Sequence, residues 1–226
     1  MILIERDKMG GECLNYGCVP SKALLHASQE KDFEKTMAHV KNAIHAIESH
    51  DSIERFEGLG VKVFFGEARF KDVHHISVGK DVIHTKYCVI ATGSEASVPQ
   101  LSGLDKVDFF TNKTVVDMKV QPKRLGIIGG GPIGIEMAQA FSNMGTKVSV
   151  IQHSRILARD DKEAVDVVRA QLIKQGVEFY EHSDVLEVKK KGKQIHLMMP
   201  KGEVKCSELL LAAGRRPSIC ALDLKK

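Results

Sequence analysis

The sequence RLGIIGGGPIGIEMAQA, from Arg124 to Ala140, determines the kind of fold that the chain adopts. Its first apolar residues, Leu125 to Ile128, have the character of a buried strand, and a helical pattern follows. The turn between them has the spacing Gly-x-Gly-x-x-Gly and consists of Gly129, Gly131 and Gly134. Glycines at this spacing permit a tight turn, close approach of the backbone to a pyrophosphate and packing of helix on strand. The stretch therefore predicts a Rossmann-like α/β domain that binds a dinucleotide.

The next expected strand, Lys147 to Ile151, ends in Gln152 rather than in an acidic residue. A carboxylate at this position would bind the free ribose 2'-hydroxyl and repel a 2'-phosphate. Gln152 removes that repulsion, and Arg155 or Arg159 is available to bind the phosphate. The sequence thus favours NADPH and leaves NADH open, because a neutral Gln152 also bonds an unphosphorylated ribose.

The alternation of helix and strand continues beyond this point. The pattern predicts an amphipathic helix and two strands, at Asp161 to Gln175, Val177 to Tyr180 and Leu209 to Ala213. Two shorter strand-like stretches, Val185 to Val188 and Gln194 to Met198, flank the lysine-rich run at residues 189–193. We interpret this run as a solvated hairpin turn rather than as a nucleic-acid-binding patch.

A second informative segment is MGGECLNYGCVPSK, Met9 to Lys22, which contains Cys13 and Cys18. In a straight helix, residues five apart are displaced by about 7.5 Å along the axis and lie roughly 140° apart around it. A disulfide requires Cα atoms closer than about 7 Å. The two cysteines can therefore pair only if the backbone leaves a straight helix between them, and Gly17, with Pro20 beyond it, permits this.

We read the cysteine pair as a redox-active disulfide, while other interpretations remain open at this stage. Two buried, inert thiols are the usual case for an intracellular domain. A structural disulfide requires an oxidising compartment, yet the apolar start Met1 to Ile4 is too short for a signal peptide. Zinc is disfavoured because four intervening residues are at the edge of ligand spacing and no second Cys/His pair lies nearby.

The first 121 residues contain helical and strand patterns besides this segment. Helices are expected at Ser21 to Glu30 and Phe33 to Ser49, and short strands at Ile2 to Glu5, Val61 to Phe65, Ala68 to Phe70, His75 to Val78 and Asp81 to His84. A buried strand, YCVIAT, is expected at Tyr87 to Thr92, leading into Gly93. We read His74 and His75 as polar strand positions and predict no metal site.

Glu5 ends the first strand, where a carboxylate bonds adenosine ribose hydroxyls in dinucleotide-binding folds. Such an acid normally follows a Gly-rich turn by about 20 residues. Only four residues precede Glu5, so we expect the chain to begin inside a domain.

Composition limits the classes of function. The 226 residues are 43% hydrophobic, with a net charge of +4 and a pI near 8.7, which is ordinary for a soluble protein and implies no nucleic-acid partner. No apolar run approaches the roughly 18 residues that a membrane span needs. We expect a cytoplasmic protein without a membrane partner.

Taken together, these motifs resemble the flavin-dependent class I pyridine nucleotide-disulfide oxidoreductases. Five stretches carry the resemblance: Gly10 to Lys22, Ile90 to Ser94, Gly129 to Glu136, Leu211 to Pro217 and His50 to Phe70. The last of these, HDSIERFEGLGVKVFFGEARF, resembles the mercuric reductase-like branch most, and a dihydrolipoamide dehydrogenase-like protein is also similar.

The resemblance implies roles for individual residues. Cys13 would attack the substrate, Cys18 would contact the oxidised flavin, and Lys22 would lie near the flavin N5, paired with Glu136. Glu5 would bind the flavin's adenosine ribose. The other residues implied to line the FAD and NAD(P) sites are Gly10, Gly11, Ala91, Thr92, Gly93, Gly129, Gly131, Gly134, Gln152, Arg155 and Gly214.

The resemblance also implies a domain order: a partial FAD-binding domain at 1–121, an inserted NAD(P)-binding domain at 122–217, and the start of a return to the FAD domain at 218–226. The family's first Gly-rich turn, its homodimerisation domain and the usual threonine before Cys13, here Glu12, have no counterpart.

We therefore expect a truncated NAD(P)H:disulfide or mercuric oxidoreductase with little turnover and doubtful FAD binding. The acceptor would be a small disulfide or a metal ion. The alternative is a non-catalytic module that binds nucleotide and senses redox state through Cys13 and Cys18.

Overall fold

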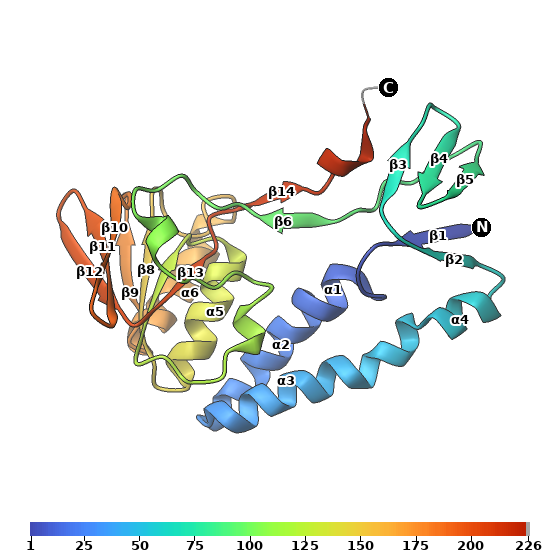
Figure 1. Cartoon of the computed structure of the whole chain (residues 1–226). Helices are drawn as coiled ribbons and strands as arrows, with labels where there is room; N and C mark the ends of the chain where they lie inside the picture. The colour runs from blue at the N-terminus through green and yellow to red at the C-terminus, as the bar shows by residue number, and fades with distance from the viewer. Residues whose placement is uncertain (225–226) are drawn as a thin grey trace.

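A computed structural model describes residues 1–224 as a mixed α/β protein (Figure 1). A four-stranded parallel sheet, in the order β13-β7-β8-β9, contains the predicted dinucleotide-binding turn. Its strands are β7 (Arg124–Ile128), β8 (Lys147–Gln152), β9 (Glu178–Glu181) and β13 (Glu208–Leu211), with helices α5 (Pro132–Asn143) and α6 (Lys162–Lys174) between them. Parallel pairing brings the carboxyl ends of all four strands to one edge, where Rossmann-like folds bind nucleotides.

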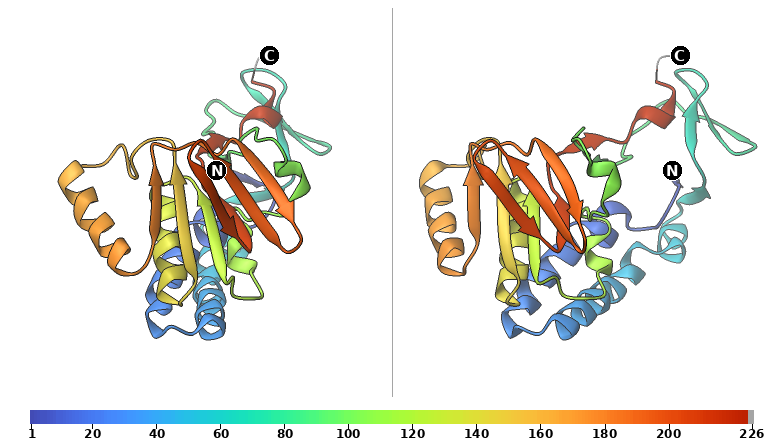
Figure 2. Two further views of the ribbon diagram at one scale, coloured as in Figure 1. Left: turned by 90° about the vertical axis from the view of Figure 1, so that its left-hand side faces the viewer. Right: turned by 60° about the vertical axis from the view of Figure 1, so that its left-hand side comes forward.

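The two faces of this sheet are covered by different layers (Figure 2). An antiparallel sheet of β10 (Glu187–Lys191), β11 (Gln194–Met199) and β12 (Gly202–Cys206) covers one face. Buried Leu197 and Val204 pack there with Ile151 and Leu209 of the parallel sheet. Helix α5 covers the opposite face, so the parallel strands are buried on both sides, as their continuous apolar runs predict.

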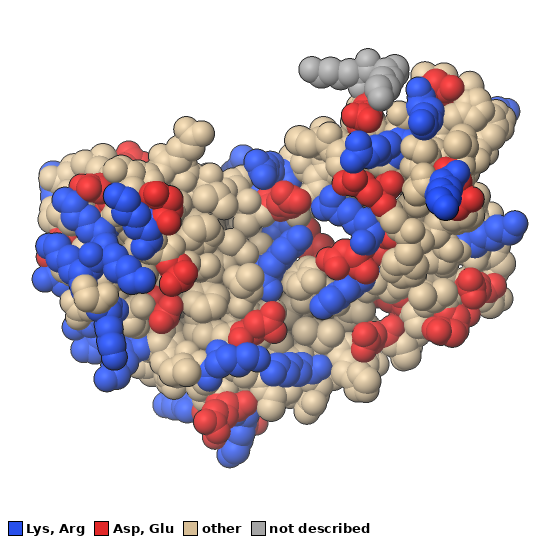
Figure 3. Space-filling model, viewed as in Figure 1, with Lys and Arg blue, Asp and Glu red and all other residues tan. Residues whose placement is uncertain are grey.

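The predicted hairpin joins β10 and β11, with Lys191 opposite Gln194, but Lys189 to Lys191 belong to strand β10 rather than to the turn. Basic side chains gather over these strands at the left of the face shown in Figure 3. Two of them are paired with carboxylates, Lys189 with Glu187 at 2.9 Å and Lys190 with Asp108 at 3.9 Å. Only Gly192 and Lys193 thus form the turn, and the charge of the run is partly compensated.

The N-terminal part contains helices and small sheets that surround the cysteine segment. Its helices are α1 (Gly11–Tyr16), α2 (Cys18–Ala27), α3 (Phe33–Glu48) and α4 (Ile53–Gly58). Strand β1 (Ile2–Glu5) pairs in parallel with β2 (Lys62–Phe65), and β3 (Ala68–Phe70), β4 (His75–Val78) and β5 (Asp81–His84) form an antiparallel meander. Strand β6 (Ser94–Ala96) pairs antiparallel with β14 (Arg215–Pro217).

One hydrophobic core joins the N-terminal helices to the parallel sheet. Buried Leu24 of α2 and Val40 of α3 belong to the same cluster as Ala138 and Phe141 of α5. The core therefore extends across the domain boundary expected at residue 121. Within residues 1–224, no helix is both long and apolar enough to cross a membrane.

The strand expected at Tyr87 to Thr92 is wrong. These residues have no regular structure, and Tyr87, Val89 and Ile90 are 80%, 87% and 47% exposed. A buried strand needs neighbouring strands on its edges, and no strand among residues 1–224 pairs with this segment. Its apolar pattern is therefore left without a sheet to join.

Smaller corrections concern where elements begin and end. Helix α2 starts at Cys18 instead of Ser21, because a proline in the first turn, here Pro20, removes no helical hydrogen bond. A 3₁₀ turn at Ser28–Glu30 ends it. Strand β13 stops at Leu211, two residues before the predicted end. Strand β1 is present, although it is only partly buried.

Candidate redox site

The two cysteines lie where one helix ends and the next begins. Helix α1 ends at Tyr16, α2 starts at Cys18, and Gly17 between them has φ −120° and ψ −114°. A Cβ atom on Gly17 would lie 3.0 Å from the Glu12 carbonyl oxygen and 3.3 Å from the Cys13 Cα. The backbone angles confirm that the chain leaves a straight helix at Gly17, and the close contacts leave little room for a side chain there.

Both thiols are exposed, and they interact with each other. The side-chain hydrogen bond with Cys18 is the main cause that raises the pKa of the Cys13 thiol, with partial burial second. The carboxylate of Asp51 adds a smaller electrostatic contribution in the same direction. The shift in the Cys13 pKa thus comes mainly from Cys18, which indicates that the two free thiols are neighbours. The alternative of two buried thiols does not hold, because both cysteines are exposed.

Lys22 and Glu136 meet across the two parts of the chain. Lys22 lies one turn after Cys18 on α2, and Glu136 lies two residues after Gly134 on α5. Their charged atoms, Lys22 Nζ and Glu136 Oε1, are 2.5 Å apart. The pair therefore joins the cysteine helix directly to the helix of the dinucleotide turn.

We expect Glu136→Gln to lower the free energy of unfolding by less than about 1 kcal/mol. The reason is that Lys22 is 62% exposed and Glu136 26% exposed, and solvent screens such pairs strongly. Urea denaturation of wild type, Glu136→Gln, Lys22→Gln and the double variant measures the coupling. A coupling above about 2 kcal/mol would mean that the pair serves stability rather than the site.

The dinucleotide turn has the packing that its glycines require. Gly129 has a φ of 115°, and a side chain there would collide with the Ala212 carbonyl group. A Cβ on Gly134 would collide with the Gly129 carbonyl oxygen. At Gly131, immediately before α5, a Cβ would meet nothing within 4 Å. The helix N-terminus is thus open to a ligand, which fits a pyrophosphate.

The residues expected to bind the ribose lie at the carboxyl end of β8, next to the dinucleotide turn. Gln152 Oε1 accepts a hydrogen bond from the Gly130 N–H at 2.8 Å, and its Nε2 donates to Ser154 Oγ at 2.9 Å. Arg155 is already engaged, since its Nη2 donates to the carbonyls of Ala158 and Asp160 at 3.2 and 2.8 Å. In the described part of the chain Arg159 is exposed and has no such partner, so it is the freer of the two arginines.

The glycines expected near the flavin adopt left-handed backbone conformations. Gly10, Gly11, Gly93 and Gly214 have φ values of 79°, 56°, 68° and 117°. A Cβ would meet nothing within 4 Å at Gly11 and Gly214, whereas Gly10 is packed against Leu14. Open backbone at two points near the cysteines fits close approach of a flat cofactor such as FAD.

The remaining predicted positions lie on β1 and around Gly93 and Gly214. Glu5 lies at the end of β1, where its Oε1 accepts from the Asp7 N–H at 2.8 Å. Ala91 and Thr92 are exposed in the segment without regular structure. The backbone of Gly93 accepts from the Ser218 N–H at 3.0 Å, and Gly214 accepts from the Ser97 N–H at 2.9 Å. Strands β6 and β14, which follow Gly93 and Gly214, therefore run side by side, and Arg215 of β14 contacts Glu12 of α1.

Sequence reasoning missed a polar cluster that fixes the start of α1. Glu12 forms an ion pair with Arg215 of β14, and Asn112 Nδ2 donates to Glu12 Oε1 at 3.3 Å. Arg215 Nε also donates to Ser94 Oγ at 2.8 Å. These partners are about 100 residues or more from Glu12 in the sequence, so no local pattern indicates the cluster. The cluster holds Glu12, the residue before Cys13, against β14, and Arg215 links β14 to Ser94 of β6.

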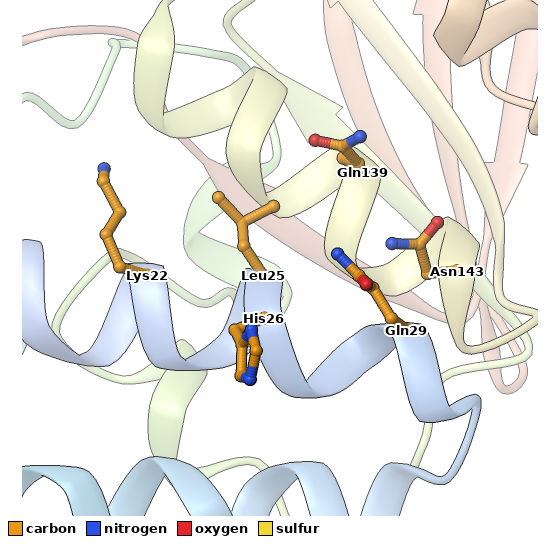
Figure 4. A pocket seen from close by; sticks show the side chains of 6 residues that line it. All are labelled: Lys22, Leu25, His26, Gln29, Gln139 and Asn143. Atoms are coloured by element: carbon orange, nitrogen blue, oxygen red, sulfur yellow. The ribbon is translucent and has the colours of Figure 1, made fainter.

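A shallow pocket of about 290 Å³ lies next to the Lys22–Glu136 pair, between α2 and α5 (Figure 4). It is lined by Lys22, Leu25, His26, Gln29, Gln139 and Asn143. Among residues 1–224, no group of three or more His, Cys, Asp or Glu side chains is arranged to hold a metal ion.

Comparison with known proteins identifies the family to which the chain is similar. Residues 1–225 match the model of the family described as pyridine nucleotide-disulphide oxidoreductase. A mercuric reductase from Lysinibacillus sphaericus is 31% identical over 245 aligned residues, which cover 98% of this chain and 45% of the relative. A probable pyridine nucleotide-disulfide oxidoreductase, RclA from Escherichia coli (strain K12), is 29% identical and is covered to 52%.

Solved structures agree with the sequence matches. The Cu(II) complex of the HOCl-induced flavoprotein disulfide reductase RclA from Escherichia coli superposes with a TM-score of 0.91 at 28% identity, covering 99% of this chain and 53% of that protein. The chain thus spans about half the length of the relatives that it matches. On these matches and on the shared motifs, the chain belongs to the pyridine nucleotide-disulphide oxidoreductase family.

Proposed function

We propose that the chain carries the dithiol and nucleotide-binding parts of a flavin-dependent disulfide reductase. Electrons would pass from NADPH or NADH through FAD to Cys13 and Cys18, and then to a disulfide or a metal ion. The contact between Lys22 and Glu136 carries this proposal, because it brings the cysteine helix and the dinucleotide turn into one site. The proposed division into residues 1–121, 122–217 and 218–226 places the site where the first two parts meet, in the cytoplasm where both nucleotides are available.

FAD, when bound, supplies the two-electron chemistry that links a nicotinamide to a disulfide. The cation of Lys22 favours negative charge that develops beside it, and Glu136 holds the ammonium group in place. Open backbone at Gly11 and Gly214 accommodates a flat ligand next to α1.

The cysteines perform the thiol chemistry in two balanced steps. In the reduced pair, the Cys13 thiolate attacks one sulfur of a disulfide, and one substrate thiolate leaves and takes up a proton. Cys18 then loses its proton and attacks Cys13 Sγ, which releases the second substrate thiol and forms the Cys13–Cys18 bridge. Two electrons have moved to the substrate, and two further electrons restore the thiols.

A metal ion is a second kind of acceptor for the same thiols. The relatives include mercuric reductases and a disulfide reductase solved as a Cu(II) complex. Exposed thiolates five positions apart, with a backbone break between them, are suitable ligands for a soft metal ion. As in full-length family members, a homodimer is the proposed assembly of the complete enzyme.

The alternative is a non-catalytic module that binds nucleotide and senses redox state through the two thiols. The exposure of Tyr87 and Val89 favours it, because this segment offers no ordered sheet edge for FAD. The visible spectrum of the purified chain after addition of FAD distinguishes the two. A retained flavin band supports the reductase, and a colourless protein with a reversible thiol pair supports the sensor.

We expect Gln152→Glu to weaken NADPH binding at least tenfold while changing NADH binding much less. A carboxylate at this position repels the 2'-phosphate and accepts from a free ribose hydroxyl. Titration calorimetry with both nucleotides measures the ratio, and Gln194→Glu on β11 controls for the added negative charge. Unchanged preference in Gln152→Glu, or no saturable binding of either nucleotide by the wild type, would contradict the proposed role of this edge.

A further inference from the structure

Two lysines lie over the ring of a single tyrosine beside the cysteines. Lys8 Nζ is 5.6 Å and Lys113 Nζ is 5.4 Å from the centroid of the Tyr16 ring. Both distances are within the roughly 6 Å over which a cation is attracted to an aromatic face. In the part of the chain that the structure describes, neither ammonium is paired with a carboxylate.

This cluster lies next to the thiol expected to attack substrate. Tyr16 follows Cys13 by three positions in α1, and side chains at this spacing are neighbours on a helix, with about 5–6 Å between Cβ atoms. By this spacing each ammonium group lies no more than about 15 Å from the Cys13 side chain, which is on the order of the Debye length of about 10 Å in 0.1 M salt. At that distance their charges act on a ligand that approaches the sulfur.

The other charges nearby are mostly compensated. Glu12 is paired with Arg215, and Lys22 is paired with Glu136. Asp51 is the carboxylate whose charge reaches Cys13. Asp7, the neighbour of Lys8 in the sequence, also has no ion-pair partner among residues 1–224, so the positive charge is concentrated at the Tyr16 ring, where the two lysines meet.

We propose that Lys8, Tyr16 and Lys113 form an anion guide that selects substrates with carboxylates next to the reacting disulfide. The inference rests on the proposed thiol–disulfide chemistry and specifies its substrate class. The tyrosine ring holds both ammonium groups beside the helix that carries Cys13, and their positive charge raises the encounter rate of anionic disulfides. Uncharged disulfides gain nothing from it.

The test uses the reduced chain in a Cys88→Ser/Cys220→Ser background, which leaves Cys13 and Cys18 as the accessible thiols because Cys206 is buried. Stopped-flow absorbance follows its reaction with dithiobis(nitrobenzoate), whose two rings each carry a carboxylate, and with uncharged dithiodipyridine. The variants are Lys8→Gln, Lys113→Gln and both together. Lys193→Gln, on the exposed β10–β11 turn, removes the same charge elsewhere.

We expect the double variant to react about 5- to 10-fold more slowly with the anionic disulfide at low salt, and within twofold of its parent with the uncharged one. The difference should vanish near 1 M salt, where charges are screened within about 3 Å. Lys193→Gln should behave like the parent with both reagents.

Two results would overturn the guide. Equal slowing with both disulfides would show that the lysines act on the thiol itself, and unchanged rates would show that they do not act at all. Failure of the proposed function has a separate signature, namely reaction that ends in two mixed disulfides without closure of a Cys13–Cys18 bridge. In that case the ratio of the rates with the anionic and the uncharged disulfide still shows whether the two lysines select anions.

Discussion

Gly134→Ala is expected to destabilise the chain by about 3 kcal/mol or more and to abolish nucleotide binding. A methyl group at this position would collide with the carbonyl oxygen of Gly129 and lie 3.5 Å from the Ala212 Cβ. The Gly129 backbone cannot move away, because the carbonyl group of Ala212, the residue after β13, packs directly against it. Helix α5 must therefore move off the sheet, which is a large change for a core that buries Ala138 and Phe141 completely.

Urea denaturation and calorimetry with NADPH measure the two effects. Gly131→Ala is the matched control, because Gly131 has an ordinary extended backbone and open space around it. We expect this control to unfold within about 1 kcal/mol of the wild type and still to bind nucleotide poorly, since the methyl group occupies the space of the pyrophosphate. A Gly134→Ala chain as stable as the wild type would contradict the packing of the turn.

The second large effect is expected at the cysteines, in the same Cys88→Ser/Cys220→Ser background. Cys18→Ser should allow the first attack on a disulfide and then stop at a mixed disulfide on Cys13. The partner thiol is what makes the second step intramolecular, and intramolecular attack by a well-placed group is worth at least about 10³-fold. Cys13→Ser should slow the first step about tenfold or more, because the attacking thiol of the proposed mechanism is gone.

Mass spectrometry of the trapped products separates the two variants. The parent should lose two hydrogens and release both substrate thiols, whereas each single variant should retain one substrate half. If Cys13→Ser reacts as fast as the parent in the first step, Cys18 is the attacking thiol and the assigned roles are reversed. If both variants still release both thiols, the pair does not act as a unit.

Features set by local geometry were predictable from the sequence. The strand, turn and helix around Gly129 and Gly134 follow from residue type and spacing alone, and β7, α5 and β8 lie where the pattern places them. The break at Gly17 follows from the distance that a cysteine pair tolerates. The contact between Lys22 and Glu136 was expected only from the family resemblance, since 114 positions separate the two residues.

Features that depend on distant partners were not predictable. The apolar run at Tyr87 to Thr92 has the composition of a buried strand, but burial depends on which strands lie beside it. The Glu12–Arg215 pair and the two lysines over Tyr16 are built from residues brought together by the fold. Charge and burial at the site thus depend on tertiary contacts, which the hydrophobic periodicity of the sequence does not predict.

The proposal that Cys13 and Cys18 form one redox unit is tested most directly by a titration in thiol–disulfide buffers. The chain is equilibrated over a range of potentials, its free thiols are alkylated, and its peptides are mapped by mass. We predict one two-electron transition that joins Cys13 to Cys18 while Cys88, Cys206 and Cys220 stay free. Independent alkylation of Cys13 and Cys18 at every potential, with no bridge between them, would contradict the account.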